Sequence, residues 1–243
     1  MISKDNPLPL YYQVKEDLFD KIKRNIYKIG ECIPSESQLL SIYNVSRTTL
    51  RTAIQELVYE GYLYALQGKG TFVNPPKAVQ DLNYITCWTE TIKKLGMRPE
   101  TKSIKYAQEP ANQLIAKLLD IESGKIINKI ERLRYANGEP LCIMTNYLIP
   151  EIAPRIFENG LIGESLYETL EKEYGVVLKR AIEKVEVTAA TKEQALLLNV
   201  NKGFRLLHVL RITFDMSDRP FEVVSAFNRG DRYAYEVQLV GRQ

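Results

Sequence analysis

Residues 34–73 read PSESQLLSIYNVSRTTLRTAIQELVYEGYLYALQGKGTFV, and this stretch decides the fold of the amino-terminal part of the chain. Ser35, with Gln38 three residues later, forms a capping-box pattern that predicts the start of a helix. Asn44 tolerates the left-handed backbone of a tight turn, so it is placed to end that helix.

A second, amphipathic helix follows, with Ser46 as its predicted cap. Its apolar residues recur at the spacing of one helix face: Leu50, Ala53, Ile54, Leu57 and Val58. Residues 62–66 and 71–73 then predict two short strands around the tip Gln67-Gly68-Lys69-Gly70. Helix, turn, helix and hairpin in this order are typical of a winged helix-turn-helix, which presents one helix to the DNA major groove.

Apolar residues upstream predict a further helix from about Tyr11 to Tyr27, with Gly30 placed to end it. They recur every four residues, at Val14, Leu18, Ile22 and Ile26. We expect the helix after Ser35 to bury Leu39, Leu40, Ile42 and Tyr43. These three helices and the hairpin would form one small domain.

The exposed face of the helix after Ser46 suits DNA readout. Arg47 and Arg51 lie four residues apart on it, beside Thr48. Arginine can bind guanine O6 and N7 with two hydrogen bonds, and threonine reaches phosphates or a thymine methyl group. In the tip, the glycines allow close backbone approach and Lys69 adds a phosphate contact. Either element alone also fits an ordinary solvated surface, and their combination favours DNA binding.

Composition limits the other possibilities. The net charge of the 243 residues is only +3, and residues 1–75 hold nine Lys and Arg against eight Asp and Glu, so any attraction to DNA has to be local. No apolar run approaches the roughly 20 residues of a membrane span, and the amino terminus lacks a signal-peptide core, so we expect a cytoplasmic protein. Three scattered cysteines and one histidine predict no metal site, and we expect no cofactor.

Beyond a Pro-Pro pair the patterning changes to strands that alternate with short helices. We expect a DNA-binding domain at 1–75, a linker at 76–80 and a second domain at 81–243. Asn137-Gly138 predicts a tight hairpin between the strands 126–136 and 141–148, and further strands extend to Val240. Hairpins dominate, so the second domain should be α+β on a largely antiparallel sheet.

Two features of this second domain could bind an anion. Arg132 and Arg134 lie two apart on a predicted strand, so both side chains point to one face of the sheet. Ser165 and Tyr167 lie at a predicted helix start, where free backbone N–H groups and the helix dipole favour negative charge. The alternatives are a solvated strand face, with Glu131 or Glu139 as partner, and plain helix capping.

The stretch at 34–73 resembles the DNA-binding signature of the GntR family of bacterial transcription regulators, and the resemblance extends over residues 7–75. In that family, recognition-helix arginines contact bases or phosphates and a wing glycine enters the minor groove. The resemblance therefore implies a set of DNA-binding residues: Ser35, Arg47, Thr48, Thr49, Arg51, Gly68 and Lys69. The family often has P-S-E-R where this chain has Ser37, so one family contact to DNA is missing.

Residues 81–243 resemble the effector-binding domain of the HutC subfamily, which is related in fold to chorismate lyase. The resemblance implies that Arg132, Arg134, Ser165 and Tyr167 hold a phosphate, with Thr89 as a further contact. It also implies Glu222 as the residue for sugar hydroxyls. The chain departs from the subfamily at Met144, where many members have a glutamate that faces the ligand.

These observations predict a ligand-responsive repressor: a homodimer on a near-palindromic double-stranded operator, modulated by a phosphorylated metabolite such as a sugar phosphate. One alternative is an enzyme of lyase-like fold fused to a DNA-binding domain. However, we identify no catalytic residue, and the only histidine, His208, lies in an apolar strand. The other alternative is a constitutive DNA binder with a vestigial pocket.

Overall fold

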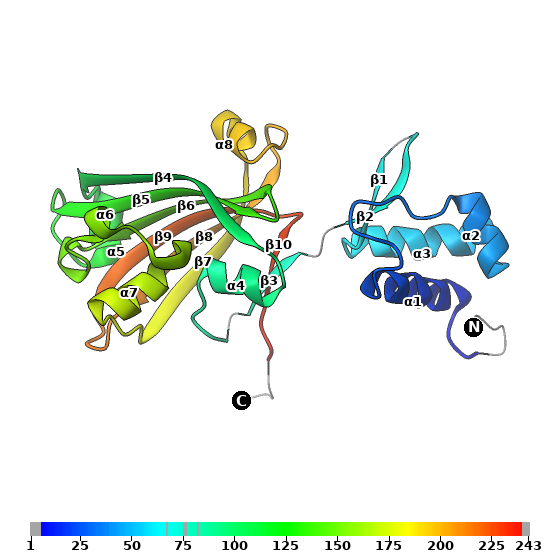
Figure 1. Cartoon of the computed structure of the whole chain (residues 1–243), viewed down its shortest axis with the longest axis horizontal. Helices are drawn as coiled ribbons and strands as arrows, with labels where there is room; N and C mark the ends of the chain where they lie inside the picture. The colour runs from blue at the N-terminus through cyan, green and yellow to red at the C-terminus, as the bar shows by residue number, and fades with distance from the viewer. Residues whose placement is uncertain (1–5, 67, 75–76, 82, 240–243) are drawn as a thin grey trace. The chain divides into compact units, whose positions relative to one another are not determined.

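The computed structural model describes residues 6–66, 68–74, 77–81 and 83–239, and it divides the chain into two compact units (Figure 1). Unit 1 comprises residues 1–77 and unit 2 comprises residues 78–243. The expected wing-tip residue Gln67, part of the expected linker and the end of the last expected strand lie outside the described residues. Among the described residues, no helix is both long and apolar enough to cross a membrane.

Unit 1 has three helices and a two-stranded antiparallel sheet: α1 (Leu10–Lys23), α2 (Glu36–Tyr43), α3 (Arg47–Tyr59), β1 (Leu63–Leu66) and β2 (Gly70–Val73). The capping box predicted at Ser35 and Gln38 forms, and Asn44 ends α2 at φ 51° and ψ 47°. Ser46 caps α3 by accepting a hydrogen bond from the Thr49 amide. Local sequence signals therefore account for the turn between these two helices.

Helix α1 ends earlier than predicted. It ends at Lys23, because Asn25 adopts φ 58° and the Ile26 amide bonds the Lys21 carbonyl at 2.9 Å. This pattern is a left-handed helix end that asparagine tolerates. Ile26 therefore lies outside the helix and is 59% exposed, and Ile42 is also exposed, contrary to our expectation. The core of unit 1 is formed by the other apolar faces, including Val14, Leu18, Leu39, Leu50 and Leu57.

Unit 2 is built on a six-stranded, fully antiparallel sheet with the order β4-β5-β6-β9-β8-β7 (Figure 1). Its strands are β4 (Pro99–Pro110), β5 (Ile126–Ala136), β6 (Glu139–Leu148), β7 (Arg180–Ala189), β8 (Arg205–Phe214) and β9 (Pro220–Arg229). Asn137 and Gly138 adopt φ values of 50° and 81° between β5 and β6. These values match the type I′ hairpin turn that the Asn-Gly pair predicts.

Helices cover both faces of this sheet. Helices α4 (Trp88–Lys94) and α7 (Leu166–Tyr174) pack on the face that carries Arg132, together with α6 (Ile156–Asn159). Helices α5 (Gln113–Leu119) and α8 (Lys192–Leu197) pack on the opposite face. Two short 3-10 turns, Pro150–Ile152 and Ile162–Glu164, complete the connections. The α+β class predicted from the hairpin pattern is confirmed.

The segment expected to be a linker differs from the expectation. Strand β3 (Ala78–Asp81) pairs in parallel with β10 (Tyr233–Glu236), and the two form a small second sheet of unit 2. The Tyr233 hydroxyl donates to the Gln80 side-chain oxygen at 2.7 Å, which joins the two strands further. Parallel pairing of segments about 150 residues apart leaves no local signal, so composition alone suggested a linker here.

Candidate functional site

The first turn of α3 presents side chains on the surface of unit 1. Arg47 and Thr48 are exposed, and Arg47 makes no ion pair among the described residues. Arg51 is also exposed, and its Nε donates to both carboxylate oxygens of Glu36, at 3.0 and 3.1 Å. Glu36 therefore orients the Arg51 side chain, while the Nη groups of Arg51 remain available for another acceptor.

The hydroxyl groups of Ser35 and Thr49 have structural partners. Ser35 Oγ lies 2.9 Å from Gln38 Oε1 and 3.0 Å from Ser37 Oγ, in the cap of α2. Thr49 Oγ1 lies 2.8 Å from Ser46 Oγ, in the cap of α3. Both hydroxyls therefore take part in helix caps. If either one also contacted a DNA phosphate, it would do so while keeping its hydrogen bond in the cap.

Two glycines shape the wing. Gly68 has φ 74° and open space where a Cβ atom would lie. Gly70 has φ 116°, a backbone conformation that favours glycine, and a Cβ there would lie 2.7 Å from Cys32 Sγ. Lys69 is exposed beside them. The described part of the wing therefore offers a narrow backbone edge with one cation.

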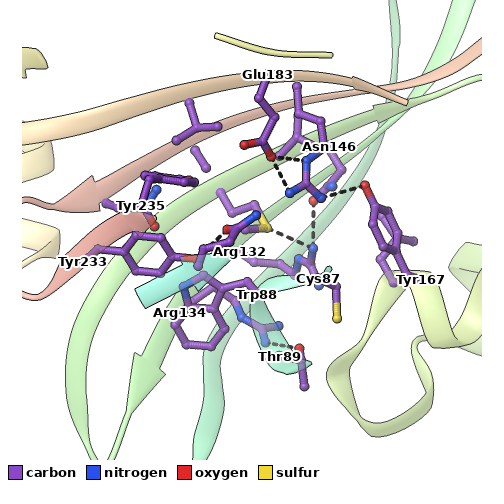
Figure 2. Close-up of a pocket in the computed structure, with 18 residues that line it drawn as sticks. Cys87, Trp88, Thr89, Arg132, Arg134, Asn146, Tyr167, Glu183, Tyr233 and Tyr235 are labelled. Carbon is purple, nitrogen blue, oxygen red and sulfur yellow. Dashed lines mark hydrogen bonds and ion pairs between the residues drawn. The ribbon is translucent and has the colours of Figure 1, made fainter. Parts of the chain in front are cut away.

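The pocket of unit 2 lies on the sheet face covered by α4 and α7, and its cavity has a volume of about 50 Å³. Register brings its floor together: Arg132 pairs with Met144, Met144 with Ala226 and Ala226 with Val209. Tyr233 and Tyr235 of β10 also line it (Figure 2). Gln80 of β3 is a further part of the pocket wall.

Arg132 and Arg134 are 5% and 1% exposed, and their guanidinium groups converge on one acceptor. Their Nη1 atoms donate to the main-chain carbonyl of Glu164, at 3.2 and 2.8 Å. Burial and, after it, the neighbouring charge of Arg132 lower the pKa of Arg134 to about 10. Burial also lowers the pKa of Arg132, although Glu222 opposes this shift. Neither arginine has a carboxylate partner within ion-pair distance among the described residues, and Glu131 and Glu139 pair elsewhere.

Helix α4 supplies the wall beside Arg134. Thr89 Oγ1 accepts a hydrogen bond from Arg134 Nη2 at 2.6 Å, and the Trp88 ring lies 4.6 Å from the Arg134 guanidinium carbon (Figure 2). Cys87 caps the helix. Thr89, predicted from the family resemblance, therefore lies beside the arginines. Trp88 was missed, although it is the only tryptophan and precedes Thr89 directly.

Glu222, Tyr167 and Ser165 have internal partners. The Glu222 carboxylate, fully buried, accepts hydrogen bonds from Asn146, from Tyr167 and from Thr213, at 2.7, 2.8 and 2.9 Å. It does not line the pocket, so it supports Asn146 and Tyr167 from behind. Ser165 Oγ accepts from the Glu168 amide at the start of α7 and also lies outside the lining. Glu168 itself pairs with Lys172, and Ser165 alone caps the helix.

Sequence reasoning missed several polar residues of the pocket, among them Asn146, Glu183 and Arg211. Asn146 accepts from Arg132 Nη2 at 2.8 Å, and it lies two residues after Met144 on the same strand face. Glu183 of β7 and Arg211 of β8 are cross-strand neighbours and form an ion pair. Because side chains alternate along a strand, the sequence could have placed Asn146 on the same face as Met144. Glu183 and Arg211 reach the pocket only because of the order in which the strands pair.

The features that would support an enzyme lie away from this pocket. His208 Nε2 lies 2.9 Å from Ser225 Oγ, and its ring stacks on Phe227 at 4.4 Å, on the opposite sheet face. Among the described residues, no group of three or more His, Cys, Asp and Glu side chains is arranged to hold a metal ion. His208 is thus a packed residue of the sheet face.

Comparison with known proteins matches both units. The model of the "Bacterial regulatory proteins, gntR family" matches residues 10–73, and that of the "UTRA domain" matches residues 94–234. The HTH-type transcriptional repressor NagR of Bacillus subtilis is 35% identical over 234 residues, 96% of each chain. A probable fructoselysine utilization operon transcriptional repressor of Escherichia coli is 31% identical over 223 residues, which are 92% of this chain and 91% of that protein.

A solved structure agrees in fold. PhnF from Mycobacterium smegmatis superposes with a TM-score of 0.73 at 22% identity, over 94% of this chain and 100% of that one. The family model at 10–73 coincides with the winged helix-turn-helix, and the UTRA match contains the paired arginines. The chain therefore belongs to the gntR family of bacterial regulatory proteins, in its HutC subfamily with a UTRA domain, and is a DNA-binding transcription regulator and not an enzyme.

Proposed function

We propose that this protein is a repressor whose affinity for its operator changes when a phosphorylated small metabolite, such as a sugar phosphate, binds unit 2. One observation carries the proposal: Arg132 and Arg134 lie buried side by side and converge on one point of the pocket without a carboxylate. Two buried cations that share a site are costly unless an anion neutralises them. Arginine binds phosphate well because its planar donors match the oxygens of that group.

The acceptor that these two arginines share is one that a phosphate oxygen could replace. The Glu164 carbonyl, a neutral oxygen, receives one hydrogen bond from each guanidinium. A phosphate oxygen at this position would accept the same two hydrogen bonds and also bring negative charge. Thr89 Oγ1 already contacts the Arg134 guanidinium, so it lies close to that position. We propose Arg132, Arg134 and Thr89 as the direct phosphate contacts, with Ser165 and Tyr167 at the adjacent start of α7.

The relatives support a sugar derivative as the class of effector. One is named as a repressor of a fructoselysine utilization operon. Another, the mannosyl-D-glycerate transport/metabolism system repressor MngR of Escherichia coli, is 25% identical over 240 residues. For this chain we propose Glu222 as an indirect contributor, because its carboxylate holds Asn146 and Tyr167 in place.

On the DNA side, we propose a homodimer that places two α3 helices in successive major grooves of a near-palindromic operator. Exposed Arg47, Thr48 and Arg51 would read the groove, and Gly68 and Lys69 would approach the backbone or minor groove. The effector acts only if it binds the DNA-competent and DNA-incompetent states with different affinity. Without such a difference the protein would be a constitutive DNA binder with a vestigial pocket.

The test uses the full chain, inorganic phosphate, glucose 6-phosphate and an operator selected by the protein from random DNA. We expect both phosphates to raise the melting temperature, because a ligand at 100 times its Kd stabilises the folded state by roughly 2.7 kcal/mol. We also expect glucose 6-phosphate to change operator affinity. The double variant Arg132→Gln/Arg134→Gln should lose both effects but still bind the operator.

Arg98→Gln is the matched control, because Arg98 belongs to the same unit and its side chain is 81% exposed. A normal response in the double variant would refute the pocket assignment. Ligand binding without any change in operator affinity would instead favour the vestigial pocket.

A further inference from the structure

Unsatisfied polar atoms gather in the pocket of unit 2. Among the described residues, eight buried side-chain nitrogen and oxygen atoms have no hydrogen-bond partner. Five of them belong to residues that line this one pocket: Trp88 Nε1, Arg132 Nε, Arg134 Nε, Glu183 Oε2 and Asn228 Oδ1. A buried polar group without a partner costs roughly 1–3 kcal/mol, so such a concentration favours a ligand that supplies hydrogen-bond partners here.

The chemistry of these atoms restricts that ligand. Three are donors, and an anion with several acceptor oxygens would satisfy the two from the arginines. The other two, Glu183 Oε2 and Asn228 Oδ1, can only accept. A phosphate monoester in its fully ionised form has no hydrogen to donate to them. The ligand must therefore also carry a hydrogen-bond donor, in a part of the molecule separate from its anionic group.

Glu183 is the stronger of the two acceptors. It is the only carboxylate among the described residues that line the pocket, and its side chain is 13% exposed. Its Oε1 is held by Nε and Nη2 of Arg211, which leaves Oε2 unpartnered. Figure 2 shows Glu183 at the side of the pocket away from Thr89, so a ligand between them would extend from one side to the other.

Within the described part of the chain, the pocket floor beside Arg132 offers no carboxylate. At residue 144, a methionine thioether lies 3.2 Å from Arg132 Nη2 and provides no carboxylate. The surrounding side chains of Val209, Val224 and Ala226 are apolar. Other polar residues also line the pocket, and among them Glu183 and Asn228 are the ones with an unpartnered acceptor atom.

We infer that Glu183 determines effector specificity by accepting a hydrogen bond from a hydroxyl or ammonium group of a ligand whose phosphate is held by Arg132 and Arg134. This inference rests on the proposed function of the same pocket. Arg211 positions the Glu183 carboxylate: it donates to Oε1 and is itself held by the Thr86 carbonyl at 3.0 Å. Ligands that lack the donor would leave Oε2 buried without a partner, and sites of this kind reject such analogues strongly.

The experiment compares inorganic phosphate, glucose 6-phosphate and glucosamine 6-phosphate by calorimetry on the full chain. The two sugars differ at one carbon, which carries a hydroxyl in one and an ammonium in the other. The variant is Glu183→Gln. Its amide oxygen has to stay with the Arg211 donors, so its NH2 group, a donor, replaces Oε2. Glu186→Gln on the same strand is the control, because Glu186 is exposed and pairs with Lys184.

We expect the wild-type protein to bind at least one sugar phosphate more tightly than inorganic phosphate. Glu183→Gln should weaken that sugar phosphate by roughly tenfold to a hundredfold, the range for a lost hydrogen bond to a charged group. Its affinity for inorganic phosphate, which also reports an intact pocket, should change less than twofold. A larger loss for glucosamine 6-phosphate would identify ammonium as the donor, and equal losses would identify a hydroxyl.

Three results would overturn the inference while leaving the phosphate site standing. They are equal wild-type affinity for all three ligands, unchanged sugar-phosphate affinity in Glu183→Gln, and a parallel loss of inorganic phosphate in that variant. A wild-type protein that binds none of the three probes would refute the proposed phosphate site and this inference together.

Discussion

Glu164, whose carbonyl accepts from both pocket arginines, and the preceding Gly163 adopt left-handed backbone conformations. Gly163 has φ 51° and ψ 27°, and Glu164 has φ 63°. A non-glycine residue in this region costs roughly 1–2 kcal/mol, so other contacts must maintain it. Here the two hydrogen bonds from Arg132 and Arg134 and the bond from the Ser165 amide to the Ile162 carbonyl do so. The turn before α7 thus depends on the same arginines that we propose as phosphate ligands.

Single residues of α3 supply the first prediction. Arg47→Ala and Arg51→Ala should each weaken operator binding by about 1–3 kcal/mol, the value of a good bidentate contact to a base. Stability should stay nearly unchanged, because both side chains are exposed and the ion pair of Arg51 with Glu36 is a surface pair. Fluorescence anisotropy with the selected operator measures the change.

The control for these variants is Arg24→Ala. Arg24 is an exposed cation in the same unit, just beyond the end of α1. It should lower affinity only through general charge, equally for operator and random DNA. Full operator affinity in both α3 variants would refute the assignment of α3 as the recognition helix.

Among the helices, the caps of α3 and α8 allow a test of how a cap affects DNA binding. Ser46 caps α3 and Thr191 caps α8, each by accepting a hydrogen bond from an amide three residues later, at 3.1 and 3.2 Å. Both caps use a hydroxyl in this way, and the cap of α8 adds a hydrogen bond from the Thr191 amide to Gln194 Oε1. Only the cap of α3 lies next to Arg47, a residue that we propose to contact DNA.

Ser46→Ala and Thr191→Ala should therefore cost similar stability, about 1 kcal/mol each, by thermal unfolding. Ser46→Ala should also weaken operator binding severalfold, because a frayed first turn no longer holds Arg47 in place. Thr191→Ala should leave operator affinity unchanged. If both variants weakened DNA binding equally, the effect would come from global stability and not from the position of the cap.

The two units have separate hydrophobic cores, so each unit can be destabilised by a substitution in its own core. Leu57 is fully buried in a cluster made only of residues from unit 1, and Ile130 is fully buried in a cluster of unit 2. The only tryptophan, Trp88, lies in unit 2, so tryptophan fluorescence reports the unfolding of that unit. Circular dichroism reports both units.

Leu57→Ala should destabilise unit 1 by about 2–5 kcal/mol, the usual cost of truncating a buried leucine. The circular dichroism transition should begin at a lower temperature, while the midpoint by tryptophan fluorescence and the affinity for inorganic phosphate stay unchanged. Ile130→Ala should instead lower the fluorescence midpoint. Coincident shifts of both probes in Leu57→Ala would show that the two units unfold as one.

Local sequence signals predicted much of this architecture. Ser35 with Gln38, Asn44 and Ser46 act within four residues, so their patterns predicted the two helices of the DNA-binding motif. Asn137-Gly138 likewise predicted its hairpin. The early end of α1 at Asn25 was missed because asparagine is a weaker helix-end signal than the glycine that follows five residues later.

The sequence by itself determined the winged helix-turn-helix, the α+β class and the shared face of Arg132 and Arg134, because caps, turns and strand periodicity are short-range properties. Only the tertiary structure decided which other side chains lie beside Arg132 and Arg134 in the pocket. Strand order β6-β9-β8-β7 brings Asn146, Glu183 and Arg211 to one pocket and buries Glu222 behind it. The pairing of β3 with β10 adds Gln80 to the pocket wall. These contacts depend on the pairing of strands distant in sequence, and no local pattern encodes that pairing.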